Sequence, residues 1–133
     1  MPPELQIVLD ENLPWSVAAE LKTRGYVATS NYALNANGLK DPEWLEIVAN
    51  LPSPSAVLVT FDNEMPVAHG PWLSSLGVTL AIIDSRNRPP NLTLPQYWHD
   101  VIHRYAHRIV FQDPGSWWKY RREMRRRLKR AAG

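Results

Sequence analysis

Residues 56–62 read AVLVTFD, a short apolar run that ends in a carboxylate. Such a run is typical of a strand buried on both faces of a parallel sheet. The same form recurs at residues 5–10 (LQIVLD) and 78–84 (VTLAIID). Three predicted strands therefore lead directly into an aspartate.

Helical segments alternate with these strands. Apolar residues at helical spacing follow Pro14 and stop at Gly25, residues 26–30 (YVATS) form a further predicted strand, and a second helix runs from Asp41 to the proline-rich residues 51–55. Alternation of this kind predicts an α/β protein with a central parallel sheet. In such sheets the functional crevice lies beyond the carboxyl ends of the strands.

The last third of the chain changes character. Prolines form a rigid linker from residue 89 to residue 95, residues 96–109 are predicted to be helical, and residues 116–130 to form a final, strongly basic helix. We therefore divide the chain into a core at residues 1–88 and, at residues 89–133, a linker with two helices. At 133 residues, both parts belong to one domain.

The amino-acid composition limits the classes of protein to which this chain can belong. The apolar fraction of 44% and the charged fraction of 21% are those of a globular protein. No run approaches the roughly 18 apolar residues that span a bilayer, and no signal peptide is apparent, so we expect a cytoplasmic protein without a membrane partner. There is no cysteine, so any metal must be held by carboxylates or histidines.

The net charge of +2 hides a division along the chain. Residues 1–116 hold seven Lys or Arg against twelve Asp or Glu, whereas residues 117–133 hold eight against one. An acidic body suits a cation, and a basic tail suits a polyanion or an acidic protein.

Three aspartates are predicted to converge at the crevice. Asp10 and Asp62 follow predicted strands, and Asp41 begins a predicted helix. Magnesium and manganese prefer oxygen ligands, and a bound cation relieves the repulsion between close carboxylates. We therefore predict that the three aspartates hold Mg²⁺ or Mn²⁺, which activates a water to hydrolyse a phosphodiester bond.

The fourth acidic ligand is open between Glu64, Glu11 and Asp84, and Glu64 is assigned to catalysis beside the three aspartates. Asp84 can equally start the loop that follows it. Asp41, which precedes a proline, can equally cap its helix.

Three blocks of sequence resemble the compact PIN-like family, which is related to the PIN-domain toxin ribonucleases of bacterial toxin-antitoxin pairs. The blocks are IVLDENLP at residues 7–14, LKDPEWL at residues 39–45 and VLVTFDNE at residues 57–64. The resemblance covers roughly residues 5–84, and three blocks in order are much more specific than any one of them.

The resemblance implies a three-layer α/β/α fold, a Mg²⁺ or Mn²⁺ site at Asp10, Asp41 and Asp62, an RNA substrate and a cognate antitoxin. The chain departs from the family at Phe61, where a basic residue is frequent. It departs again at residues 64–65 (EM), where a second Asp followed by Phe is usual.

Four polar residues flank the aspartates in these blocks and are predicted to contact substrate: Glu11, Asn12, Thr60 and Asn63. Thr60 can also orient Asp62 or simply pack within its strand. Glu11 thus has two predicted roles, as a substrate contact and as an alternative metal ligand.

His99, His103 and His107 recur every four residues, so a helix places them along one side. Three imidazoles can bind zinc. The apolar residues beside them favour a second interpretation, in which the histidines are the polar border of a buried stripe.

The basic tail is predicted to bind RNA through Arg121, Arg122, Arg125 and Arg126, with Trp118 available to stack on a base. Alternatively, the tail is the surface that an acidic antitoxin covers, or a solvated end. We expect the chain to be a metal-dependent endoribonuclease that acts as the toxin of a toxin-antitoxin pair. A homodimer is also possible. The competing hypothesis is an inactive PIN-like module that binds nucleic acid or protein.

Overall fold

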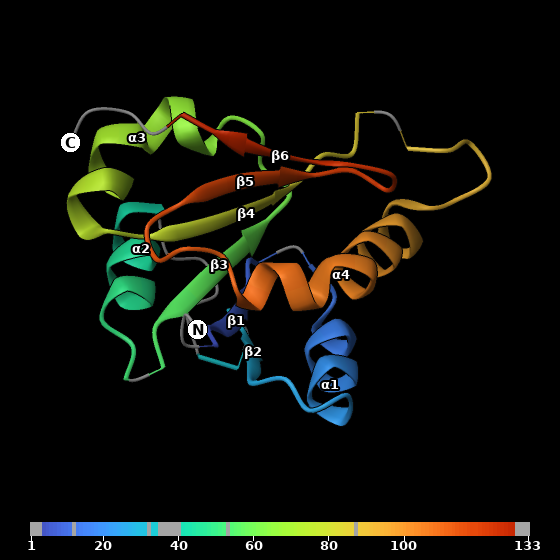
Figure 1. Cartoon of the computed structure of the whole chain (residues 1–133), viewed down its shortest axis with the longest axis horizontal. Helices are drawn as coiled ribbons and strands as arrows, with labels where there is room; N and C mark the ends of the chain where they lie inside the picture. Colours follow the sequence, from blue (N-terminus) through green and yellow to red (C-terminus); the bar gives the residue numbers. More distant parts are fainter. Residues whose placement is uncertain are drawn as a thin grey trace.

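A computed structural model describes residues 4–11, 13–31, 33–34, 41–52, 54–86 and 88–129, without the side chain of Asp41. These residues form one six-stranded sheet and four helices (Figure 1). The strands are β1 (Gln6–Leu9), β2 (Ala28–Ser30), β3 (Ala56–Thr60), β4 (Thr79–Ile83), β5 (Trp117–Tyr120) and β6 (Arg125–Leu128). The helices are α1 (Trp15–Thr23), α2 (Asp41–Ala49), α3 (Met65–Leu76) and α4 (Leu94–Val110). The predicted α/β class is confirmed.

The sheet order is β2-β1-β3-β4-β5-β6, with β1 to β5 parallel and β6 antiparallel to β5. Leu9 of β1 pairs with Val59 of β3, and Thr60 of β3 pairs with Ile82 of β4. The carboxyl ends of β1, β3 and β4 therefore lie side by side, as do the residues that follow them.

Helices cover both faces of the sheet. One buried cluster, which includes Ile7, Val59 and Ala106, fills the space between the sheet and the helices α1 and α4. A second cluster, which includes Leu58 and Trp44, lies between the sheet and the helices α2 and α3. Successive residues of β3 contribute to opposite clusters, as the alternation of side chains along a strand requires. The fold is thus layered α/β/α.

Helix α4 makes an unusual crossover. Helix α1 connects β1 to β2 in one direction along one face, and α2 and α3 connect their strands in the other direction along the opposite face. These three connections share one hand. Helix α4 proceeds in the direction of α2 and α3 but packs on the face of α1, so its connection has the opposite hand, which is rare. As a result α4 lies against α1 (Figure 1).

The helix predicted for residues 116–130 is wrong, because this segment forms the hairpin of β5 and β6. Trp117 and Tyr120 are buried in opposite core clusters, an arrangement that a strand permits and a single helical stripe does not. Aromatic residues also favour strands, and β5 occupies the edge of β4 that would otherwise be open. The C-terminal extension is therefore one helix followed by a β-hairpin.

Helix α3 is not predicted from the sequence. Its interior contains Gly70 and Pro71, and the backbone departs from helical geometry at His69. These residues interrupt the apolar periodicity that identifies a helix. Within the described ranges, no helix is long and apolar enough to cross a membrane.

Candidate acidic site and basic hairpin

One hydroxyl group bonds both the side chain of Asp10 and the backbone of Asp62. Thr60, which is fully buried at the end of β3, donates a hydrogen bond of 2.7 Å to Oδ2 of Asp10. The same hydroxyl accepts a 3.1 Å hydrogen bond from the backbone N–H of Asp62. Because β1 and β3 are neighbours, the two predicted metal ligands lie at adjoining strand ends, and Thr60 orients both segments.

The side chain of each of these aspartates also accepts a hydrogen bond from the backbone that follows it. Oδ1 of Asp10 accepts a 2.8 Å hydrogen bond from the N–H of Glu11, and Oδ1 of Asp62 accepts a 2.9 Å hydrogen bond from the N–H of Glu64. Asp10 and Asp62 are half-buried, whereas Glu11 and Glu64 are exposed. The two glutamates therefore lie nearer to the solvent than the aspartates. We define the acidic site as Asp10, Asp62 and, at its rim, Glu64.

Asn63 lies in the turn between β3 and α3, at the acidic site. Its Oδ1 atom is buried and has no hydrogen-bond partner among the described residues. An acceptor without a partner is uncommon in a folded protein, so this amide is suited to contact a ligand. The predicted substrate contact Asn12 lies outside the described residues, as does the side chain of Asp41.

Asp84 follows β4 at the same edge of the sheet but has a different environment. Its side chain is fully buried and bonded to two arginines, through Nε and Nη2 of Arg86, each at 3.0 Å, and through Nε of Arg121 at 3.0 Å. The hydroxyl of Tyr97 donates a 2.7 Å hydrogen bond to its backbone carbonyl. Asp84 is thus the centre of an ion-pair network.

The pKa of Asp84 reflects this pairing. Burial acts to raise the pKa, but hydrogen bonds from the side chain and backbone of Arg86 and from the side chain of Arg121 outweigh it. The net result is a pKa well below the usual value for aspartate. Because two guanidinium groups already balance its charge, Asp84 is the least suitable of the three alternatives for the fourth metal ligand.

A metal ion of the usual kind needs several converging ligands. Among the side chains that the structure describes, Glu20, His99 and His103 are the one group of three acids or histidines whose ligand atoms all lie within 4.8 Å of one another. The acidic site contributes two aspartates at adjoining strands, so further oxygen ligands must come from Glu64, Glu11, Asp41, water or substrate.

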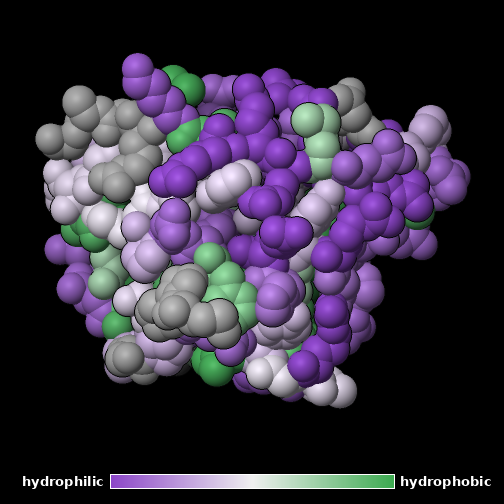
Figure 2. Space-filling view, in the orientation of Figure 1, coloured by the Kyte–Doolittle hydropathy of each residue, from purple (hydrophilic) through white to green (hydrophobic). Residues whose placement is uncertain are grey.

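Cationic side chains crowd the hairpin of β5 and β6. Lys119, Arg121, Arg125 and Arg126, together with Met124, line a hollow of about 250 Å³. Burial, followed by the positive charges of Arg86, Arg126 and Arg121, lowers the pKa of Lys119, although Asp84 opposes them. Figure 2 shows that hydrophilic side chains predominate on the face that carries this hairpin. The excess positive charge favours an anion.

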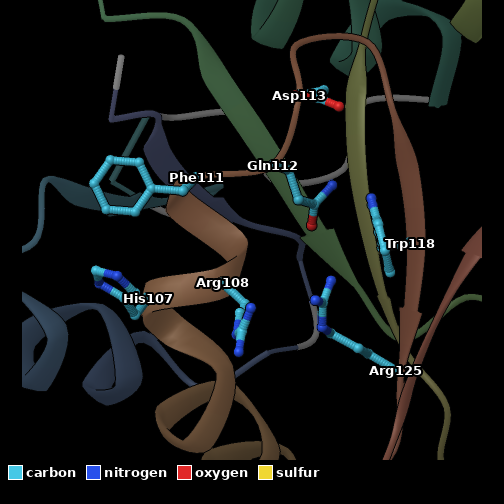
Figure 3. A pocket seen from close by; sticks show the side chains of 7 residues that line it. All are labelled: His107, Arg108, Phe111, Gln112, Asp113, Trp118 and Arg125. Carbon is cyan, nitrogen blue, oxygen red and sulfur yellow. The ribbon is translucent and has the colours of Figure 1, made fainter. Parts of the chain in front are cut away.

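A second hollow, of about 370 Å³, lies between the end of α4 and β5. In Figure 3, Arg108 from α4 and Arg125 from β6 point into the space between these elements, beside Trp118. The guanidinium of Arg125 lies 4.4 Å from the centre of the Trp118 ring. A base could stack on Trp118 only where Arg125 does not cover it, so the two predicted contacts compete for one ring face.

The predicted basic contacts are therefore not equivalent. Arg121 is bonded to Asp84, and Nε of Arg122 lies 3.0 Å from a carboxylate oxygen of Asp100. Arg126 is exposed on the strand face that also carries Lys119. Sequence reasoning did not include Arg86 in this surface, although Arg86 follows Asp84 by two residues, a spacing that permits local pairing.

Comparison with models of protein families, with curated proteins and with solved structures finds no match to this chain. The resemblance to the PIN-like family thus remains a hypothesis based on the three sequence blocks.

Proposed function

We propose that this chain is a metal-dependent ribonuclease of the PIN-like type, which hydrolyses phosphodiester bonds at the acidic site. The observation that carries the proposal is the link from Asp10 through the hydroxyl of Thr60 to Asp62, at the carboxyl ends of neighbouring parallel strands. Open α/β sheets bind ligands at this edge. The direct test is RNA cleavage, with and without manganese, by the intact protein and by its Asp10→Asn and Asp62→Asn variants.

The donors at the acidic site fit magnesium or manganese. Asp10 and Asp62 offer hard carboxylate oxygens, and two such groups with water and phosphate oxygens make a usual shell for these ions. When bound, the cation would lower the pKa of a water and offset negative charge on the phosphate. Thr60 holds the carboxylate of Asp10 in place, and Glu64 at the rim would accept a proton from the attacking water.

The basic hairpin supports RNA as the substrate. Its cations surround a hollow on one side, and Lys119 has a lowered pKa, caused first by burial and then by neighbouring positive charges. A phosphate group placed there would relieve the repulsion among those charges. In the sheet the hairpin lies next to β4, and Asp62 follows β3 on the other side of β4, so a strand of RNA could contact both surfaces.

The Thr60→Val variant tests the proposed link. Valine keeps the shape but removes the hydroxyl, which loosens Asp10 and leaves the Asp62 N–H without its acceptor. We expect stability to fall by about 1–2 kcal/mol, the usual cost of an unsatisfied buried group, and manganese-dependent cleavage to fall about tenfold. Thr60→Ser, which retains the hydroxyl, should recover most of the activity. Equal activity in both variants would argue against the link.

The Arg126→Gln variant tests the RNA surface. A plot of log affinity against log salt concentration has a negative slope. Removing one phosphate contact on single-stranded RNA should make this slope less steep by about 0.7. Arg104→Gln is the matched control, because Arg104 is also exposed but lies on α4, on the other side of the sheet. Fluorescence titration at several salt concentrations measures both slopes, and identical slopes would place RNA elsewhere.

A specific observation favours a second candidate function, a nucleic-acid-binding module without catalysis. Two arginines neutralise Asp84, and the described carboxylates at the strand ends do not form a set of three that converge. Calorimetric titration with manganese distinguishes the candidates, since a module would bind RNA in a salt-sensitive way but would not bind manganese.

A narrower form of the nuclease proposal is a toxin whose antitoxin is acidic. The support is the charge of the hairpin, where a carboxylate-rich segment would meet Lys119 and Arg126. Co-purification of the chain with the product of an adjacent open reading frame, lost at high salt and in a variant with both residues changed to Gln, would test this form. Light scattering of the isolated chain would show whether it forms the homodimer.

A further inference from the structure

A cluster of two histidines and one glutamate lies on the opposite side of α4 from the hairpin, where α4 meets α1. His99 and His103 are one turn apart on α4, and their ring centres are 4.2 Å apart. Glu20 projects from α1, with Oε2 in contact with Nε2 of His99 and 3.2 Å from Nε2 of His103. All three ligand atoms lie within 4.8 Å of one another.

We propose that Glu20, His99 and His103 bind a zinc-like transition-metal dication that joins α1 to α4. The separation of 3.2 Å between Glu20 Oε2 and His103 Nε2 is close to the roughly 3.3 Å edge of a tetrahedron whose metal-ligand bonds are about 2.0–2.1 Å long. Glu20 and His103 therefore already have the spacing that one shared ion requires, whereas the contact between Glu20 and His99 is shorter than this edge and must lengthen.

The donor set selects the metal. Two imidazole nitrogens and a carboxylate oxygen suit zinc, copper or nickel, whereas magnesium and calcium require mainly oxygen ligands. Three protein ligands leave a fourth position for water. Glu20 and His99 are about half exposed, so an ion can enter from solvent.

His103 carries the strongest sign that the group is incomplete without an ion. Its Nε2 atom is buried and has no hydrogen bond among the described residues, although Glu20 is near. A buried polar atom without a hydrogen-bond partner is uncommon in a folded protein, so this ring nitrogen is suited to bind a ligand.

Arg24 competes with a metal ion for His103. Its Nη1 atom lies 2.7 Å from Nδ1 of His103 and donates a 3.1 Å hydrogen bond to the carbonyl of the same residue. When Nε2 binds a metal, Nδ1 carries the proton and cannot accept from Arg24. Arg24 then keeps only its hydrogen bond to the carbonyl of His103, and its positive charge also repels the ion. Arg24→Ala should therefore bind zinc more tightly than the intact chain.

The experiment is calorimetric titration of the chelator-treated full chain with zinc, together with the absorption spectrum of its cobalt complex. We expect one zinc per chain and a rise in melting temperature of roughly 5–10 °C at ~100 times the dissociation constant. Loss of an outer partner of a metal ligand costs ~10–100-fold, so His99→Ala, His103→Ala and Glu20→Gln should each weaken binding at least about 100-fold.

His107→Ala is the matched control, because His107 is exposed one turn further along α4 and packs edge-on against Phe111 instead. Its affinity for zinc should equal that of the intact chain. Glu20→Gln changes an exposed side chain and keeps the test valid if a histidine variant fails to fold. No zinc binding by the intact chain, or binding that is lost in Asp62→Asn but kept in the cluster variants, overturns the proposal. It does not depend on the nuclease proposal, which concerns different residues and a different class of metal.

Discussion

Changing Asp62 to Asn is expected to reduce manganese-dependent RNA cleavage by roughly 1,000-fold, because a loss of about 4 kcal/mol of charge stabilisation in the transition state has that effect on rate. Asn keeps the shape of Asp, and its carbonyl oxygen can still accept the hydrogen bond from the N–H of Glu64. The change thus removes the negative charge with little disturbance of the turn. Asp10→Asn should have a similar effect.

The measurement is the single-turnover rate of cleavage of a labelled RNA at saturating manganese. Asp113→Asn is a suitable control, because Asp113 is an exposed acid that pairs with Arg127 near the start of β5, away from the carboxyl ends of the strands. Its rate should match that of the intact chain. Unchanged circular dichroism and melting temperature would establish that Asp62→Asn is folded. Full activity in both aspartate variants would refute the proposed site.

Double substitution adds information that single variants do not. Asp10 and Asp62 would share one ion, so removing the second carboxylate after the first should cost little further activity. Two independent sites would instead give losses that multiply. The comparison therefore distinguishes one shared metal site from two separate carboxylates that each assist the reaction.

Local sequence determines the parts of this fold that could be predicted. Residues 56–62 form a strand and a following aspartate because a short apolar run can be buried on both faces of a sheet. The same holds for β1 and β4. Parallel order then brings Asp10 and Asp62 to one edge, so their placement follows from the sequence and general topology.

The β-hairpin could not be predicted in the same way. Residues 116–130 have both an apolar stripe at helical spacing and aromatic residues that favour strands. The choice depends on β4, which offers an open edge to Trp117 and its neighbours. A distant strand therefore determines the structure of residues 116–130. The periodicity of these residues contains no information about that strand.

Pairings across long distances in the chain were equally inaccessible. Arg121 lies 37 residues from Asp84, and His99 lies 79 residues from Glu20. The second pairing depends on the unusual hand of the crossover that contains α4, because the common hand would place α4 on the other face of the sheet. The histidine spacing was visible in the sequence, but its carboxylate partner was not.

Changing Asp84 to Asn should destabilise the fold by about 3 kcal/mol, because the removal of one partner from a buried ion pair leaves the other charges uncompensated. Arg86 and Arg121 would then face a neutral amide, although both can partly turn to solvent. Arg86→Gln is the matched control. Its side chain is 60% exposed, so the loss should be clearly smaller than that of Asp84→Asn. Urea unfolding at neutral pH measures both, and equal losses would contradict a central role for Asp84.

The pH dependence of stability tests the same network. The pKa of Asp84 lies below its ordinary value of 3.8 in the folded protein, so folding favours the ionised carboxylate. This contribution is fully present well above pH 3.8 and is lost as the pH falls through the folded pKa, because protonation then breaks the pairing in the folded state as well. The difference in unfolding free energy between the intact chain and Asp84→Asn should therefore be constant from pH 6 to 8 and should shrink below about pH 4. A difference that stays constant down to pH 2 would mean that the arginines do not hold this carboxylate ionised, and the loss in Asp84→Asn would then have to come from packing.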